Sequence, residues 1–278
     1  MPAGNREPAW SGVIEHPLPG RGGKPRRVGL TMVMDKGLGL RGTADLLETA
    51  GEAIDFWKLP FGTSAFYPRQ VLEAKLRLIR RLGILAYPGG TFLEVACRQG
   101  RGEAFIEHAL ALGFTALEVS DGTGPMPRLE RLRVIRRAVA AGAAVLAELG
   151  GKAAGGRLPR RELGARLEED LAAGAALVIL EGRESGKGVG IYSDQGEVLV
   201  EELERVREAV ADPDRLMWEA PLRTQQAELI RRAGPGVNLG NIPPGEVLAL
   251  EALRAGLRAD TLPEAGWAVW AASVAEVG

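Results

Sequence analysis

The sequence predicts a single α/β domain, a (β/α)8 barrel. A short apolar run, a polar loop that contains glycine and an amphipathic helical segment follow one another eight times between residues 28 and 262. Short apolar runs of this kind are typical of parallel strands that are buried on both faces. Several helical segments end in glycine, as helix C-termini often do. Eight strand–helix units without a strong linker fit one barrel within 278 residues.

The expected elements follow in chain order. The apolar runs occupy residues 28–34, 53–57, 83–87, 115–119, 143–149, 176–180, 216–220 and 236–240. Residues 244–258 form the last expected helix. Residues 1–27 are rich in Pro, Gly and Arg, so we interpret them as an extended arm or a disordered leader. Residues 263–278 are expected to form a C-terminal extension docked on the barrel.

Composition narrows the class of protein. The net charge of -1 and the lack of a basic stripe with interleaved aromatics argue against nucleic-acid binding. No apolar run approaches the roughly 18 residues of a membrane span, and the N-terminus lacks a signal-peptide core. A single cysteine, Cys97, excludes an internal disulfide framework. We expect a soluble cytoplasmic protein. Apolar residues on the outer helices, with Trp267 and Trp270, favour a homo-oligomer.

The stretch after the sixth apolar run predicts a phosphate-binding loop. Glu181 begins the sequence EGRESGKG, which combines glycines, a hydroxyl and two cations. Glycine backbones can close around an anion while arginine and lysine neutralise it. The alternative is a polar surface turn, and the spacing excludes a Walker A loop. The expected phosphate-binding residues are Arg183, Ser185, Gly186 and Lys187, joined by Gly240 and Asn241 from the eighth strand.

A second glycine motif favours a different fold. Residues 37–42 match GxGxxG between an expected strand and an expected helix, and Asp55 follows, as in dinucleotide-binding domains. In that fold the acidic residue lies at the far end of the second strand, whereas Asp55 lies near its start. Eight repeats also exceed the six strands of that fold. The barrel remains the better interpretation.

Strand alternation places four glutamates in the mouth of the barrel. Active sites of such barrels lie at the carboxyl ends of the strands, where every second side chain points inward. Clustered carboxylates repel one another unless a proton or a cation neutralises them, and oxygen ligands beside a phosphate favour Mg2+ over zinc. Alternatively, one or two of them pair with Arg or Lys and only shape the barrel. The expected metal ligands are Glu118, Glu148, Glu181 and Glu219.

Lysine is scarce, and its placement is informative. Only six of the 35 basic residues are lysine, and those at strand ends are Lys36, Lys58, Lys152 and Lys187. A compact amine with a tunable pKa suits acid–base chemistry, and neither histidine follows an expected strand. We expect Lys75, in contrast, on an exposed helix surface. The catalytic candidates are Lys36, Lys58, Lys152 and Glu148.

The ordered motifs resemble the phosphosulfolactate synthase family over residues 28–262. They read MDKGL, IDFWKLPFGTSA, YPGGTFLE, GFTALEVSDG, EGRESGKGVG and VNLGNI. The resemblance implies a Mg2+-dependent barrel enzyme, a carbon–sulfur lyase, that adds sulfite to phosphoenolpyruvate and gives (2R)-phospho-3-sulfolactate. It also implies that a lysine at the position of Lys152 protonates the carbanion. The product would feed coenzyme M synthesis, as in archaeal members, or sulfolactate formation, as expected for bacterial relatives.

The residues leave two other functions open. A related lyase or isomerase could use the same mouth on another phosphorylated, enolate-forming acid. Plant heat-stress proteins that act as protein-protective partners also resemble this family, so a non-enzymatic function is the third hypothesis, although the mouth residues count against it. One departure concerns the acid. The family usually has two lysines after the glycine of the fifth strand, whereas this chain has Lys152 alone.

Overall fold

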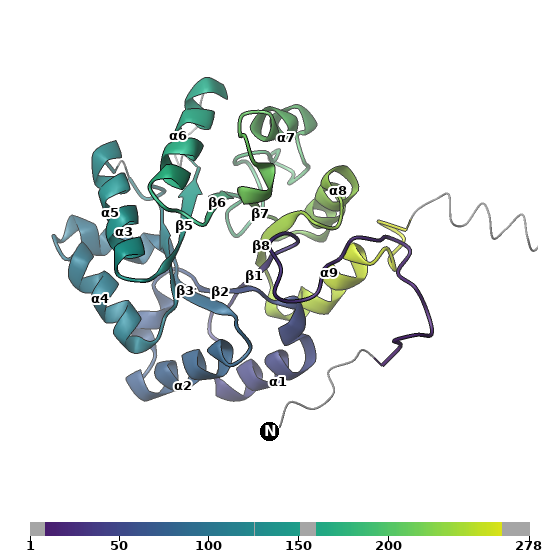
Figure 1. Cartoon of the computed structure of the whole chain (residues 1–278), viewed down its shortest axis with the longest axis horizontal. Coiled ribbons are helices and arrows are strands. Elements are labelled where there is room, and N and C mark those ends of the chain that lie inside the picture. Colours follow the sequence, from purple (N-terminus) through teal and green to yellow (C-terminus); the bar gives the residue numbers. More distant parts are fainter. Residues whose placement is uncertain (1–8, 125, 151–159, 263–278) are drawn as a thin grey trace, which may run out of the picture.

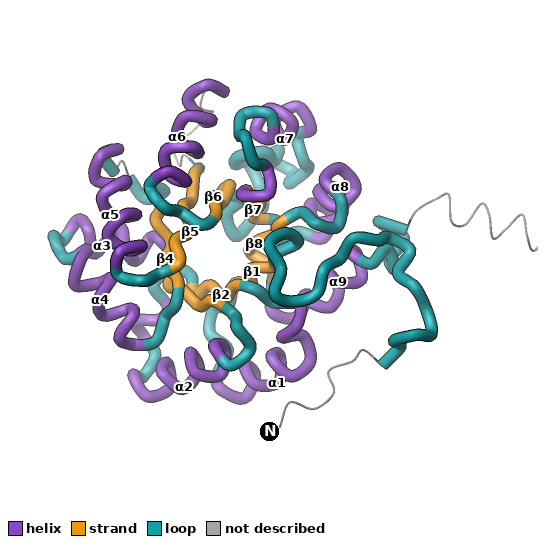
Figure 2. The backbone as a smooth tube through the Cα atoms, in the orientation of Figure 1, coloured by secondary structure: helices purple, strands orange, loops and turns teal. Residues whose placement is uncertain are grey.

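The fold is a (β/α)8 barrel, which confirms the predicted fold class (Figure 1). The computed structural model describes residues 9–124, 126–150 and 160–262. Within them the strands form a central ring with helices outside it (Figure 2). The strands are β1 Thr31–Met34, β2 Phe56–Leu59, β3 Leu85–Pro88, β4 Ala116–Val119, β5 Ala144–Leu149, β6 Leu177–Leu180, β7 Leu216–Glu219 and β8 Asn238–Ile242.

The helices alternate with the strands, except that two helices connect β3 to β4. They are α1 Leu40–Ala50, α2 Arg69–Arg80, α3 Gly90–Arg98, α4 Gly102–Leu112, α5 Arg128–Ala140, α6 Arg160–Ala172, α7 Val200–Arg207, α8 Arg223–Ala233 and α9 Val247–Arg254. Short 3-10 helices lie at Gly51–Ala53, Thr63–Phe66, Pro213–Arg215 and Pro244–Glu246. Gly100, with a φ of +70°, separates α3 from α4 because this left-handed conformation ends a helix. No helix in the described ranges is long and apolar enough to span a membrane.

The sheet closes with two irregularities. Its order is β3-β2-β1-β8-β7-β6-β5-β4, and the paired strands are parallel. Between β3 and β4 the Thr115 amide donates to the Ala86 carbonyl, and the Ala86 amide donates to Thr115 Oγ1, both at 3.0 Å. Between β1 and β8 the register shifts by one residue, and Asn241 adopts a φ of +56° within the shift.

Alternation along the strands produces two apolar layers. The side chains inside the barrel form a small cluster that includes Met32, Leu146, Ile179 and Met217. The side chains between the barrel and its helices form the larger cluster, which holds the alternate residues of each strand. The strand period of two therefore points the residues that follow the inner cluster, such as Glu148 after Leu146, into the barrel.

The segment before β1 contacts α9 and the residue that follows it. The Leu18 amide donates to the Ala255 carbonyl at 3.1 Å, and Arg21 forms an ion pair with Glu251 at 2.6 Å. Arg254 is fully buried and donates to the carbonyls of Pro235 and Val237. Figure 1 shows this segment running beside α9. These contacts join residues 18–21 to α9, and Arg254 joins α9 to the segment that enters β8.

Candidate active site

A buried lysine lies among three glutamates at the carboxyl ends of the strands. Lys58 Nζ is 2.8 Å from Glu118 Oε2, 3.1 Å from Glu219 Oε1 and 3.4 Å from Glu148 Oε2. Lys58 lies within β2, where Phe56 and Lys58 point inward, rather than just after the strand. We call these four residues the glutamate–lysine cluster. The predicted convergence of the glutamates is confirmed for these three, and a lysine joins them at the centre.

The cluster holds excess negative charge. Burial opposes the charge of Lys58, but Glu118, Glu219 and Glu148 outweigh it and raise the pKa of Lys58 well above its usual value. Burial and the neighbouring carboxylates, Glu118 first among them, raise the pKa of Glu148 well above its usual value, against the opposing effect of Lys58. Lys58 therefore stays an ammonium ion at neutral pH, while Glu148 takes up a proton more readily than an exposed carboxyl would.

Backbone amides at two glycines hold the glutamates in place. The Gly90 amide, at the start of α3, donates to Glu118 Oε1 at 2.7 Å, and the Gly182 amide donates to Glu219 Oε2 at 3.0 Å. A Cβ on Gly90 would lie 2.8 Å from the Ser120 Cβ and 2.9 Å from Glu118 Oε1, which is too close. A Cβ on Gly182 would overlap the Glu219 backbone carbonyl, so both positions require glycine.

Glu181 lies beside the cluster rather than in it. It is buried, its Oε1 is 3.8 Å from Arg183 Nε, and its charge contributes to the raised pKa of Glu148. A Cβ on Gly150 would overlap the Glu181 side chain. Glu181 thus connects the cluster to the loop after β6, which carries the candidate phosphate-binding residues.

The carboxylates fit Mg2+ in type but do not form a closed cage. Among the residues that the structure describes, no three Asp, Glu, His or Cys side chains are arranged to hold a metal ion. Mg2+ is usually bound by one or two carboxylates together with waters and substrate phosphate, so it does not require such a cage. Four carboxylates near one ammonium leave negative charge that a divalent cation would neutralise. Glu148 lies farther from Lys58 Nζ than Glu118 and Glu219 do, and Glu181 lies beside the cluster, so these two are the candidates for holding a cation.

The loop from Gly182 to Gly190 is shaped by left-handed backbone. Arg183, Gly186, Gly188 and Gly190 all have positive φ, and the Gly186 carbonyl accepts a hydrogen bond of 2.6 Å from Gln225 Nε2. The side chains of Arg183, Ser185 and Lys187 are exposed. The loop therefore presents its cations to solvent on a fixed backbone, as an anion-binding loop would.

The two residues expected from β8 have different surroundings. Asn241 Nδ2 donates to the Arg183 carbonyl at 3.5 Å, and Asn241 Oδ1 is buried without a hydrogen-bond partner. Asn241 therefore lies with the loop after β6. Gly240 packs instead against the methionines inside the barrel, because a Cβ there would meet Met32 and Met217. Its position is explained by close packing.

Lys36 connects the loop after β1 to the loop after β6. Its Nζ is 2.5 Å from Glu184 Oε1, and both side chains are about half exposed. Lys36, Glu184 and Arg183 thus share the solvent side of the mouth, while the glutamate–lysine cluster forms its buried floor. This arrangement separates an exposed, cation-bearing rim from a buried, acidic floor.

A comparison with known families identifies the chain. Residues 19–260 match the sequence profile of (2R)-phospho-3-sulfolactate synthase (ComA). The chain belongs to this family. It is 42% identical over 246 residues to the phosphosulfolactate synthase of Methanothermobacter thermautotrophicus, covering 88% of this chain and 95% of the relative. It is 37% identical over 246 residues to that of Bacillus subtilis, covering 88% and 96%. The resemblance seen in the motifs is confirmed.

Solved structures support the fold alone. The YdjI aldolase from Escherichia coli K12 superimposes with a TM-score of 0.54 at 16% identity and covers 83% of this chain and 81% of its own. At such low identity the likeness shows that the barrel is shared and says nothing of the reaction. The phosphosulfolactate synthase family, by contrast, is shown by sequence and indicates an enzyme.

Two expectations about lysines have different outcomes. Lys152, the acid that the family resemblance implies, lies outside the described residues, so its role stays a prediction. Lys75 was expected on a helix surface, and this is wrong: its side chain is fully buried, and its Nζ is 2.5 Å from Asp35 Oδ2. The reason is its place in α2, where Leu72, Lys75 and Ile79 recur on the buried face.

Sequence reasoning missed two further buried polar residues of this family member. Glu94, on α3, accepts hydrogen bonds from the Gly122 and Thr123 amides and from the Ser120 hydroxyl, and so shapes the loop after β4. Tyr87, on β3, points into the barrel, and its hydroxyl is buried without a hydrogen-bond partner. Strand alternation could have found Tyr87, since it pairs in register with Lys58. Glu94 gave no such signal.

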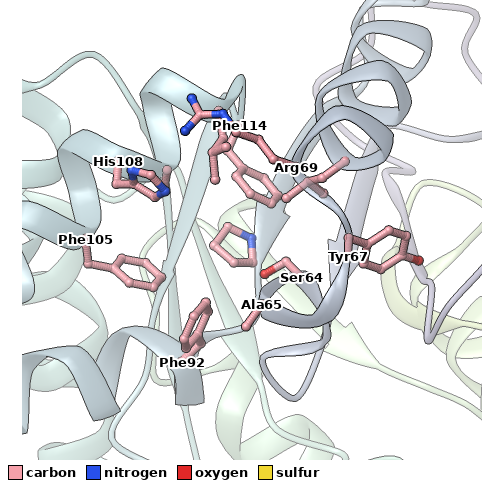
Figure 3. Close-up of a pocket in the computed structure, with 12 residues that line it drawn as sticks. Ser64, Ala65, Tyr67, Arg69, Phe92, Phe105, His108 and Phe114 are labelled. Atoms are coloured by element: carbon pink, nitrogen blue, oxygen red, sulfur yellow. The ribbon is translucent and has the colours of Figure 1, made fainter.

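An apolar pocket lies outside the barrel, between α2 and α4 (Figure 3). Its volume is about 230 Å³, and its walls include Phe92, Phe105 and Phe114 with His108 and Arg69. Phe92 and Phe105 meet edge to face, with ring centroids 4.9 Å apart. Since its lining is drawn largely from helices and not from the strand ends that carry the glutamates, the pocket is separate from the candidate active site.

Proposed function

We propose that this chain catalyses the Mg2+-dependent addition of sulfite to phosphoenolpyruvate, giving (2R)-phospho-3-sulfolactate. The observation that carries the proposal is the mouth itself: an acidic, buried floor beside an exposed loop with two cations, in a member of this family. The reaction forms a carbon–sulfur bond, so the enzyme would be a carbon–sulfur lyase named for the reverse direction.

The rim would bind the phosphate and carboxylate of the substrate. Arg183 and Lys187 project from a loop whose glycine backbone is bent in the left-handed region, and Lys36 lies beside it. An incoming phosphate would replace Glu184 as the partner of Lys36, because a dianion binds an ammonium more strongly than a solvated carboxylate does. Ser185 and the amide of Asn241 would add neutral hydrogen bonds.

The chemistry needs charge stabilisation and one proton. Sulfite sulfur attacks the methylene carbon of phosphoenolpyruvate, and the electron pair of the double bond moves to the carbon that bears the carboxylate and phosphate. Positive charge near that carboxylate lowers the barrier. Lys58 cannot donate the proton readily, because its pKa is raised well above the usual value. We infer that Lys58 acts through its fixed charge and that Lys152 supplies the proton.

Mg2+ would be held by Glu148 and Glu181 together with substrate oxygens. Bound there, it would supply positive charge that offsets the developing negative charge on the substrate carboxylate. The protein's own residues prepare this position, since the Gly150 backbone leaves room for Glu181 and burial concentrates the acidic charge. The cytoplasmic location and homo-oligomeric state expected from composition stay predictions.

A coupled assay tests the proposal. Purified protein would be incubated with phosphoenolpyruvate and sulfite, with and without Mg2+, and the organic sulfonate would be identified by mass spectrometry. We expect sulfite-dependent turnover that needs Mg2+ and falls in Lys152→Ala. Tight phosphoenolpyruvate binding without a sulfonate product would favour a related lyase or isomerase. The absence of both phosphoenolpyruvate binding and turnover would contradict an enzymatic function for this mouth.

A further inference from the structure

A buried network lies directly behind the loop that carries Lys36. Lys75, on the outer helix α2, and Asp35, just after β1, are both fully buried and form an ion pair of 2.5 Å. Asp35 Oδ2 also accepts a hydrogen bond of 2.9 Å from Trp57 Nε1. An ion pair so far from water is costly to desolvate, and apolar residues of the same shape could fill this space as well. Its presence calls for a role other than stability.

Side chains of the network hydrogen-bond to the backbone of Gly37 and Leu38, directly after Lys36. Asp35 Oδ1 accepts hydrogen bonds from the amides of Gly37 and Leu38, at 2.9 and 2.7 Å. Lys75 Nζ and the Tyr67 hydroxyl both donate to the Leu38 carbonyl, at 2.5 and 3.1 Å. The two amides are thus held by Asp35, and the Leu38 carbonyl is held by side chains from α2 and the loop before it.

A backbone hydrogen bond connects Asp35 to the floor of the mouth. The Asp35 amide donates to the Lys58 carbonyl at 2.9 Å, so the position of the β1 end is tied to the strand that carries Lys58. Lys36, between the fixed Asp35 and Gly37, reaches Glu184 across the mouth. A flexible lysine side chain can bind a phosphate at one place only if its backbone is held there.

We propose that Asp35 and Lys75 are positioning residues for Lys36, holding its ammonium where the substrate phosphate binds. They act through the backbone of residues 36–38 and do not touch the substrate. The ligand class is a phosphorylated carboxylic acid, and in this respect the inference rests on the proposed function. Removing the pair would let Lys36 move and so weaken substrate binding, while the glutamate–lysine cluster stays intact.

The test uses the double variant Asp35→Asn/Lys75→Met, which removes both charges and leaves neither buried alone. The variants Lys36→Ala and the triple combination complete a double-mutant cycle. We expect KM for phosphoenolpyruvate to rise at least about tenfold in the double variant, since the hydrogen bonds to residue 35 lose their charge and the Leu38 carbonyl loses its Lys75 donor. In the Lys36→Ala background the same double change should leave KM nearly unchanged. Equal effects in both backgrounds would overturn the proposal.

Two further measurements keep the test decisive. Amide hydrogen exchange of Gly37 and Leu38 should speed up at least about tenfold in the double variant, independently of any turnover. Unchanged exchange would also overturn the proposal. Arg254→Met is a matched control, because it removes a buried cation at the amino end of the barrel and should lower stability without raising KM. If wild type shows no turnover, calorimetric binding of phosphoenolpyruvate replaces KM, which separates this test from the proposed reaction.

Discussion

Replacing Lys58 by methionine tests whether the floor of the mouth is held together by one charge. The side chain keeps its approximate length, so little volume is lost and the main effect is electrostatic. Lys58 is 7% exposed and Glu118 and Glu219 are each 2% exposed, so the variant leaves at least two carboxylates buried without their cation. Breaking a buried ion pair typically costs about 3–5 kcal/mol, and we expect a loss in this range at pH 8.

The expected pH dependence follows from the carboxylates. Burial and mutual repulsion raise the pKa of Glu148, and without Lys58 the opposing effect is lost. A carboxyl whose folded pKa lies above its unfolded value stabilises the fold at low pH, and this contribution is lost as the pH rises through the folded pKa. The deficit of Lys58→Met should therefore shrink as the pH falls below 8.

Urea unfolding followed by tryptophan fluorescence would measure both effects, with stability taken by linear extrapolation. Trp57, the neighbour of Lys58 in β2, is fully buried, so its emission should report the transition. Glu148→Gln is the matched variant: it removes one negative charge, and combined with Lys58→Met it should recover part of the lost stability. A cost below about 1 kcal/mol at pH 8, in the range of exposed pairs, would refute the reasoning.

Three other predictions follow from described contacts. Gly90→Ala should cost about 1–3 kcal/mol by overpacking against Glu118 and should lower activity, whereas Gly245→Ala, with open space around it, should do neither in urea unfolding and turnover assays. The pKa of Tyr67 is raised to about 12 by burial and Asp35, and the pKa of the other two tyrosines is also raised, so an absorbance titration should show little tyrosinate at pH 11 until the protein unfolds. The native tyrosines keep their protons to a higher pH than unfolded ones do, so the free energy of unfolding should fall as the pH rises above about 10. Tyrosinate in the folded protein at pH 10 would contradict this. Asp170→Asn removes the 2.8 Å ion pair of the buried Arg131 and leaves it the more distant Asp121 at 3.9 Å, so it should cost about 3–5 kcal/mol. Glu130→Gln, in an exposed pair, should leave the unfolding midpoint unchanged.

The barrel was predictable because its signals are local. Strand alternation correctly directed Glu118, Glu148 and Glu219 inward, since a period of two needs only the strand itself. The predicted ends of elements were less exact. Strand β2 includes Lys58, and α9 is shorter than residues 244–258 because a 3-10 helix precedes it and Gly256, with a φ of +72°, follows its end. Tertiary packing sets such limits, and the sequence does not show it directly.

The partners of the buried polar residues were not predictable. Lys75 and Asp35 form an ion pair although 40 positions separate them, and no local sequence pattern indicates that they are partners. Lys58 was found as a lysine of the mouth, but its place among the three glutamates depends on strands that lie far apart in the chain. Helical spacing did mark Lys75 as buried, because it recurs with Leu72 and Ile79. Taking lysine as an exposed residue by default concealed that signal.

The pairing of β1 with β8 sets the order in which the chain can be completed during synthesis. Leu30 and Asn238 hydrogen-bond although 208 positions separate them, so the open side of β1 has no native neighbour until the last strand leaves the ribosome. At about 5–20 residues per second, this wait lasts roughly 10–40 s. The segment before β1 waits longer, because its partners lie in and after α9. A nascent chain of this protein therefore carries an unsatisfied strand edge through most of its translation, and a stalled ribosome would leave that edge for another chain to pair with.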